Sequence, residues 1–271
     1  MKNRILALSW LILALTIQNV VSQSSTKLWY NSPAQFFEET LVLGNGKMGA
    51  TVFGGVQSDK IYLNDATLWT GEPVNANMNP EAYKNLPAIR EALKNENYAL
   101  AEKLNRKLQG TFSQSYAPLG TMYIKTTHSD QVQNYYRELD LQNAVSKVTY
   151  EADGVKYTRS YFISYPDQVM VIKLTSSRKS ALTFNLIFES QLRNQIQIKN
   201  KMLIANGYAP VHADPGYRKN DKDPVRFVEN RGTRFSTMYK IKNKGGQLIQ
   251  TDSTIGVKNA TEAVIYVSIA T

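Results

Sequence analysis

The sequence has 271 residues, of which 32 are Lys or Arg, 22 are Asp or Glu and none is Cys, so its formal charge is +10 at neutral pH. The absence of Cys excludes disulfides, a thiol nucleophile and thiolate metal sites. The length favours one large domain over two small ones.

Residues 1–22 are predicted to be a secretory signal peptide. Lys2 and Arg4 form a charged start, Ile5–Ile17 is mostly apolar, and small residues precede an expected cleavage point after Ser22. The apolar run of about thirteen residues is shorter than the roughly 20 that a transmembrane helix needs. We therefore expect an exported protein, periplasmic or extracellular and free of the membrane after cleavage. A retained membrane anchor is the alternative.

The positive charge is concentrated between Arg193 and Lys244, where twelve Lys and Arg accompany four acidic residues. A nucleic-acid groove would suit this imbalance. The basic residues are scattered over strand and loop positions, however, and form no helical stripe or binding motif. The pattern indicates a solvated face, or a face docked on an acidic neighbour, and no nucleic-acid partner is predicted.

The segment Leu41–Pro73 carries most of the information about function. Gly44, Gly46 and Gly49 have the GxGxxG spacing of a dinucleotide-binding loop. That motif needs a helix after its last glycine, whereas Ala-Thr-Val-Phe-Gly-Gly follows here, so a strand, an Asn-Gly turn and a second strand are predicted. No cofactor is expected. A further strand, Lys60–Leu63, is followed by an Asx turn at Asn64-Asp65.

A helical pattern covers roughly residues 80–109. Asn79 is a candidate N-cap and Pro80 suits the first turn. Leucine and isoleucine recur at helical spacing, and polar residues in the middle of the segment indicate two consecutive helices. We expect the apolar stripe to pack on the core. The stripe consists of Leu86, Ile89, Leu93, Leu100, Leu104 and Leu108.

Beyond Ser113 the sequence predicts short strands separated by turns. A hairpin with a type I′ turn is expected at Asp153-Gly154. The fold class is therefore mostly β: a large antiparallel β-sandwich with a short helical insertion. The last strand pattern, Glu262–Ala270, runs directly to the end of the sequence, and this predicts a domain truncated at its C-terminal end.

Candidate site residues come from aromatic and polar side chains in the first half of the chain. Flat rings with polar edges suit sugars and also domain interfaces. We select Asn64, Asp65, Trp69 and Tyr116 as candidates that bind carbohydrate or face a neighbouring domain. The alternative for Trp69 is a core or interdomain residue, as is common for large aromatic side chains. Two His without Cys predict no metal site, and no catalytic residue is predicted.

Five blocks in fixed order resemble the N-terminal β-sandwich domain of glycoside hydrolase family 95. They read NSPAQFFEETLVLGNGKMGATVFGGV, IYLNDATLWTGEP, NPEAYKNLPAIREAL, QSYAPLG and YYRELDLQNAVSKVTYEADGVKYTRSYFISYPDQVMVIKL. The resemblance extends from about Trp29 to the end of the sequence. One departure is the run Asn64–Trp69, which reads Asn-Asp-Ala-Thr-Leu-Trp where the family usually has Asn-Glu-Asp-Thr-Leu-Trp.

The resemblance implies an exported α-L-fucosidase that inverts configuration at terminal fucosyl or related residues of a glycan. Family members are longer, and their general acid, base and water-activating residues lie in an (α/α)6 barrel whose motifs do not occur here. The hypothesis is that residues 23–271 are the N-terminal domain of such an enzyme and are inactive alone. The alternative is a stand-alone, non-catalytic carbohydrate-binding module.

Overall fold

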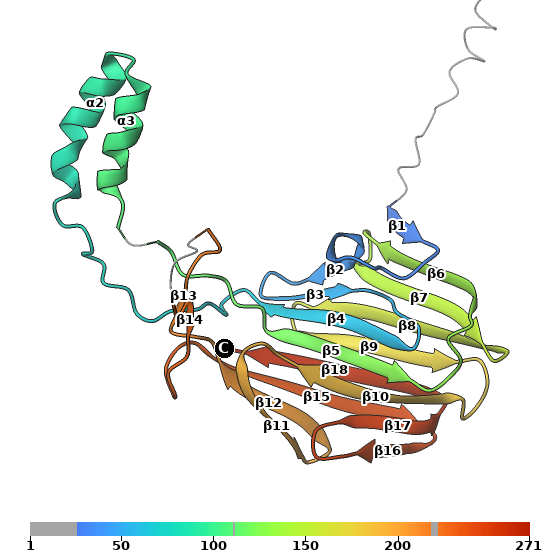
Figure 1. Ribbon diagram of the computed structural model, residues 1–271. Helices are drawn as coiled ribbons and strands as arrows, with labels where there is room; N and C mark the ends of the chain where they lie inside the picture. The colour runs from blue at the N-terminus through green and yellow to red at the C-terminus, as the bar shows by residue number, and fades with distance from the viewer. Residues whose placement is uncertain (1–25, 111, 218–221) are drawn as a thin grey trace, which may run out of the picture.

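Two antiparallel β-sheets packed face to face form the body of the protein, and a helical hairpin stands away from one end (Figure 1). The structure, a computed structural model, describes residues 26–110, 112–217 and 222–271. The predicted signal peptide, residues 1–22, lies outside these residues, and the predicted domain limits remain predictions. The predicted fold class, a large antiparallel β-sandwich with a short helical insertion, is confirmed.

The larger sheet has nine strands in the order β1-β6-β7-β8-β9-β18-β15-β12-β11. Their bounds are β1 Lys27–Tyr30, β6 Gln133–Asp140, β7 Val145–Ala152, β8 Val155–Ser164, β9 Val169–Ser176, β18 Glu262–Ala270, β15 Arg234–Lys244, β12 Met202–Tyr208 and β11 Arg193–Lys199. Neighbours in this order pair antiparallel throughout.

The smaller sheet has seven strands in the order β16-β17-β10-β5-β4-β3-β2. Their bounds are β16 Gln247–Gln250, β17 Ile255–Ala260, β10 Leu182–Glu189, β5 Gly120–Thr126, β4 Ser58–Asp65, β3 Met48–Val52 and β2 Leu41–Gly44. A separate ladder pairs β13 His212–Ala213 with β14 Val225–Arg226.

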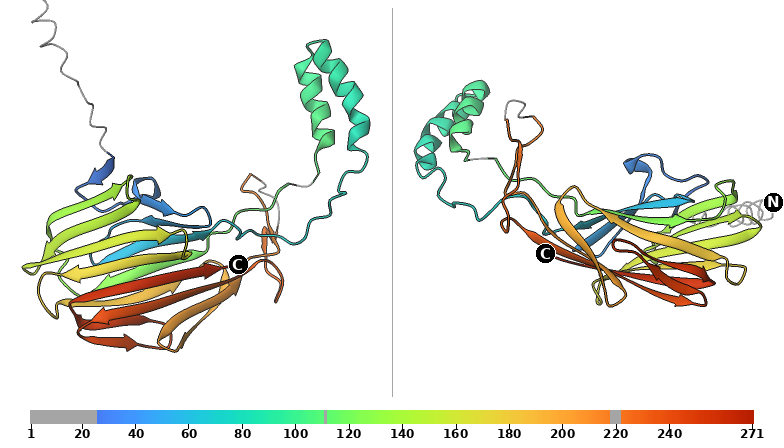
Figure 2. Two further views of the ribbon diagram at one scale, coloured as in Figure 1. Left: turned by 180° about the vertical axis from the view of Figure 1, so that it is seen from behind. Right: turned by 60° about the horizontal axis from the view of Figure 1, so that its bottom comes forward.

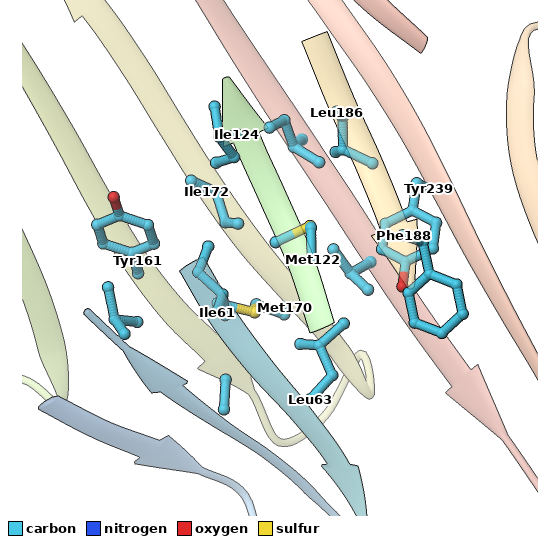
Figure 3. Close-up of a cluster of buried hydrophobic side chains, with 14 of the residues drawn as sticks. Ile61, Leu63, Met122, Ile124, Tyr161, Met170, Ile172, Leu186, Phe188 and Tyr239 are labelled. Carbon is cyan, nitrogen blue, oxygen red and sulfur yellow. The ribbon is translucent and has the colours of Figure 1, made fainter. Parts of the chain in front are cut away.

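Strand alternation builds the core between the two sheets. In β4, Ile61 and Leu63 point inward and meet Met122 of β5 and Met170 of β9 in a continuous apolar layer (Figure 3). Inward residues of the central strands are almost fully buried, whereas their neighbours along each strand face outward; the edge strands β1, β11 and β16 have no buried residue. Sheet periodicity therefore decides which side chains are available to a ligand.

Two of the three predicted turns join neighbouring strands, as expected. Asp153 and Gly154, which join β7 and β8, both have positive φ, +52° and +68°, as a type I′ turn requires. Asn45-Gly46 joins β2 and β3, and the Asn45 Oδ1 accepts hydrogen bonds from the amides of Lys47 and Met48 at 3.1 and 2.8 Å. Because β3 pairs with β4 and no helix follows Gly49, the segment is not a dinucleotide loop.

The helical insertion differs from the prediction in where it begins and in what it packs against. It comprises η2 Ala82–Asn85, α2 Leu86–Lys94, α3 Tyr98–Asn105 and η3 Arg106–Leu108, while η1 Phe37–Glu39 lies earlier in the chain. The Asn79 side chain does not cap a helix, since its Nδ2 donates to the carbonyls of Lys107 and Gln109 and closes the base of the hairpin. Pro87, not Pro80, occupies the first turn of α2.

The prediction that the apolar stripe packs on the core was wrong. The hairpin stands away from both sheets (Figure 2), and only small or central residues such as Ile89 and Ala101 are buried between its helices. Leu86, Leu93 and Leu100 remain exposed, with 49% of the surface of Leu93 accessible.

None of the helices in the described part of the chain has the length and apolar character of a membrane span.

A buried polar network joins the two sheets. Asp59 on β4 accepts hydrogen bonds from the amides of Gly54 and Gly55 and from the Tyr161 hydroxyl of β8, and its Oδ2 lies 3.5 Å from the Arg159 guanidinium. Burial raises the pKa of Asp59, and the Arg159 charge is the largest opposing influence. Arg159 also donates to the carbonyls of Gly55 and Val56, each at 2.6 Å.

The same network continues to a half-buried histidine. Arg159 donates to the Tyr150 hydroxyl at 2.7 Å, and that hydroxyl lies 2.8 Å from His128 Nε2. Because His128 Nδ1 lies 2.9 Å from the Ser129 carbonyl, the arrangement fits a neutral ring that donates from Nδ1 and accepts at Nε2. Burial lowers the pKa of His128; the Ser129 carbonyl opposes this shift and Arg159 adds to it.

Replacing Arg159 with Met should lower the free energy of unfolding by about 3–5 kcal/mol, because Asp59 would be left buried without its cation. The control is Lys173→Met, which breaks the exposed Lys173–Glu262 pair on neighbouring strands and should cost less than about 1 kcal/mol. Urea unfolding of both variants measures the difference, and equal losses would contradict the structural role of Arg159.

The stability of the protein should depend on His128 protonation. Because the folded pKa lies below the unfolded value of 6.5, the unfolded state binds the proton first, and stability falls as the pH drops through about 6.5. In His128→Gln this part of the pH dependence should disappear. Urea unfolding at about pH 7.5 and pH 5.5 tests this, and an unchanged difference between the two pH values would refute it.

Candidate functional site

The end of β4 and the loop after it contain three of the four predicted site residues: Asn64 and Asp65 are the last residues of the strand, and Trp69 lies in the loop. Asp65 is fully buried, and its Oδ1 accepts hydrogen bonds from the Thr67 amide at 2.9 Å and the Thr67 hydroxyl at 2.6 Å. This is the predicted Asx turn. The Asp65 carboxylate therefore holds the loop and presents no accessible surface to a ligand.

Trp69 and Tyr116 lie against each other at the end of the sandwich. They form an isolated antiparallel β-bridge, with ring centroids 5.6 Å apart and planes at 76°. The Trp69 Nε1 donates to the Ala66 carbonyl, and the Tyr116 hydroxyl donates to the Asp65 carbonyl, both at 3.0 Å. Burial, with help from Asp65, raises the pKa of Tyr116. Both rings keep exposed surface, 46% for Trp69 and 40% for Tyr116.

Asn64 points away from this cluster because it precedes Asp65 on the strand and faces the opposite side. Its side chain lines a groove of about 680 Å³ on the outer face of the seven-stranded sheet, here called the β4–β5 groove. Tyr116 lines the same groove at one end. Its full lining is Phe37, Lys60, Tyr62, Leu63, Asn64, Tyr116, Pro118, Gly120, Thr121, Tyr123, Glu189, Ser190 and Gln191.

Most of the groove residues were missed by sequence reasoning. Lys60 and Tyr62 on β4, and Thr121 and Tyr123 on β5, alternate with core residues and face outward. The alternation in these two segments is the signal that could have identified them. Antiparallel pairing then sets Lys60 opposite Tyr123 and Tyr62 opposite Thr121, in two adjacent rows.

Beyond Trp69 the chain contacts the segment that connects β12 and β15. The Gly71 amide donates to the Pro210 carbonyl at 2.9 Å, and Glu72 forms an ion pair with Arg231 at 2.6 Å. A groove of about 360 Å³ lies between these segments, and one of about 810 Å³ lies along β11, β12 and β15. Arg193 and Arg234, from the predicted basic region, line the larger one.

These three grooves do not offer the chemistry of glycoside hydrolysis. Within the described residues, each has one acidic side chain in its lining: Glu189, Glu72 and Glu229. Hydrolysis of a glycosidic bond normally needs two carboxyl groups that flank the bond. Among residues 26–110, 112–217 and 222–271, no group of three or more His, Asp and Glu is placed to hold a metal ion.

A comparison with protein families identifies the family of this domain. The family described as "Glycosyl hydrolase family 65, N-terminal domain" matches residues 28–271. The chain belongs to this family. The predicted resemblance to a glycoside hydrolase N-terminal β-sandwich is thereby confirmed, while the assignment to family 95 in particular stays a prediction.

Similar proteins carry fucosidase names. "Alpha-L-fucosidase 2" of Arabidopsis thaliana is 29% identical over 251 residues, covering 89% of this chain and 30% of that protein. "Probable alpha-fucosidase A" of Aspergillus oryzae is 30% identical over 181 residues, covering 63% of this chain and 25% of that protein. This glycosyl hydrolase N-terminal domain therefore spans under a third of the length of these relatives.

A solved structure has the same fold. "Putative kojibiose phosphorylase from human microbiome" aligns with a TM-score of 0.50 and 10% identity, over 90% of this chain and 32% of that one. At this identity the likeness concerns the fold alone.

The hydrogen bond from Tyr116 to the Asp65 carbonyl should contribute measurably to stability. Tyr116→Phe should lower the free energy of unfolding by about 0.5–1.5 kcal/mol, because it leaves that carbonyl without its side-chain donor. Tyr123→Phe is the control, since the structure gives the Tyr123 hydroxyl no hydrogen bond within the described chain. Chemical unfolding that ranks the two variants equally would contradict the role assigned to Tyr116.

Proposed function

We propose that this chain is the N-terminal scaffold domain of an exported α-L-fucosidase-like glycoside hydrolase of family 95. The observation that carries the proposal is the alignment of 89% of the chain with 30% of a protein named alpha-L-fucosidase. The order of the five sequence blocks supports the narrower family. The substrate of the complete enzyme is then a terminal fucosyl or related residue of a glycan.

Catalysis in this proposal belongs to a barrel formed by polypeptide outside the 271 residues. An inverting enzyme uses one carboxylic acid to protonate the leaving oxygen and a second carboxylate to activate water on the opposite face of the sugar. The grooves described above have single acidic side chains, which supports a non-catalytic role for this domain. Its contribution is to hold and orient its neighbour.

The helical hairpin supports the role as a scaffold. Leu86 and Leu93 are seven residues apart on α2 and so share one face, and Leu100 is exposed on α3. Exposed leucines that gather on one element are typical of a surface that packs on another protein surface. The hairpin lies at the same end of the sandwich as Thr271, whose hydroxyl contacts that of Thr67 (Figure 1).

Export is part of the proposal and rests on the predicted signal peptide at residues 1–22. Cleavage after Ser22 would leave a mature chain that begins shortly before β1. N-terminal sequencing of the secreted protein tests this part independently of the enzyme assignment.

The full 271-residue chain should not turn over an aryl α-L-fucoside. The measurement is release of the aryl alcohol by the purified chain, with an authentic α-L-fucosidase as positive control. Activity that rises with chain concentration and survives further purification would overturn the claim that catalysis lies elsewhere. We expect the rate of aryl alcohol release to equal the rate in buffer alone.

A further inference from the structure

The β4–β5 groove has the composition of a sugar-binding surface. Its centre consists of two cross-strand rows: Lys60 faces Tyr123 across β4 and β5, and Tyr62 faces Thr121. On the far side, β10 continues the second row, because Thr121 also pairs with Glu189. Three strands of one rigid sheet therefore fix these side chains, with no loop between them.

Aromatic rings line the groove at several points. Phe37, 56% exposed, stacks on Tyr62 with ring centroids 6.1 Å apart, and Tyr123 lies on the neighbouring strand. The Tyr123 hydroxyl can donate a hydrogen bond; burial, with contributions from Glu189 and Tyr62, raises its pKa. Rings of this kind offer apolar faces together with polar edges, as the C–H face and hydroxyl rim of a sugar ring require.

Hydrogen-bonding groups around these rings are free. The side chains of Asn64, Thr121, Glu189 and Gln191 line the groove, and the structure gives them no hydrogen bond within the described chain. The Asn64 and Gln191 amides can donate to sugar hydroxyls or accept from them, and the Glu189 carboxylate can accept from them. A surface meant only for apolar packing would not place so many unpaired polar groups beside its rings.

The charge of the groove favours a neutral ligand. Its lining has one cation, Lys60, and one anion, Glu189. The Lys60 ammonium lies 3.8 Å from the centre of the Phe53 ring, so a cation–π contact already engages it. A phosphate or nucleic-acid site would instead need an excess of Lys or Arg.

We propose that the β4–β5 groove binds a neutral oligosaccharide, with a sugar ring placed on Tyr62 and Tyr123 and its hydroxyls bonded by Asn64, Glu189 and Gln191. The groove binds and does not hydrolyse, because Glu189 is its only carboxylate among the described residues. This goes beyond the scaffold role and does not depend on it: turnover tests the location of catalysis, whereas binding tests the groove.

The experiment is a titration of the full chain with 2′-fucosyllactose, lactose and maltotriose, followed by saturation-transfer NMR and calorimetry. Inorganic phosphate serves as the charged comparison. We expect saturable binding of at least one sugar and none of phosphate. The absence of saturable binding by all three sugars overturns the proposal, as does tighter binding of phosphate.

Tyr123→Ala should weaken sugar binding about threefold to tenfold, the loss expected for one aromatic contact. The matched control is Tyr266→Ala. Tyr266 also faces outward from a strand, with the Lys242 ammonium 5.6 Å from its ring, much as Lys125 lies 5.9 Å from Tyr123, but it belongs to the other sheet. Equal weakening in both variants, or none in Tyr123→Ala, would refute the assignment to this groove.

A second variant keeps both rings and blocks the space between them. Thr121→Arg puts a long side chain into the middle of the groove and should abolish binding, while circular dichroism reports an intact sandwich because Thr121 faces outward. Undiminished sugar binding by folded Thr121→Arg would contradict the proposed position of the ligand.

Discussion

The buried contact between Asp59 and Arg159 is the constraint on which the arrangement of the two sheets depends. Asp59 is on β4 of the seven-stranded sheet and Arg159 is on β8 of the nine-stranded sheet, and both are almost completely buried. A buried charge without its partner costs several kcal/mol. The pair therefore favours a single alignment of the two sheets. A shift of the apolar residues around it would cost less stability.

The orientation of every β4 side chain follows from Asp59. With Asp59 inward, the period of two places Ile61, Leu63 and Asp65 inward and their neighbours outward. A slip by one residue would bury the side chains that face the groove and expose Asp59. The network thus explains why Asn64 and Asp65, adjacent in sequence and chosen together as candidates, have different roles: Asn64 lines the groove, and Asp65 holds the turn.

The sequence predicted the features that depend on neighbouring residues. The Asp153-Gly154 turn requires positive φ at two successive positions, and the Asx turn requires a side chain that bonds the chain two residues on; both are local. Gly44, Gly46 and Gly49 were correctly predicted not to form a dinucleotide-binding loop, because β-branched residues follow them. Family membership could be recognised for the same reason, since ordered blocks survive in the sequence itself.

Long-range features could not be predicted in this way. The β4–β5 groove exists because β5 pairs with both β4 and β10, and β10 lies more than 50 residues beyond β5 in the chain. Partners of His128 and Arg159 also come from distant parts of the chain: His128 contacts Tyr150 of β7, and Arg159 donates to the Gly55 and Val56 carbonyls. Helical periodicity predicted the hairpin correctly, but not what the apolar stripe contacts, because a leucine that faces a core and one that faces solvent have the same spacing.

The hairpin and the β4–β5 groove are both exposed, yet their chemistry differs, and the difference indicates different occupants. The hairpin presents exposed leucines and lies away from the two sheets of the sandwich (Figure 2). Covering such a surface lowers the free energy, because it removes apolar area from water. A large protein surface can cover it. The groove lies on a rigid sheet and combines rings with unpaired amide and carboxylate groups, for which apolar burial alone would be costly. A hydroxyl-rich ligand satisfies those groups and covers the rings at once, so a single domain can hold a neighbouring domain through the hairpin and a glycan through its sheet.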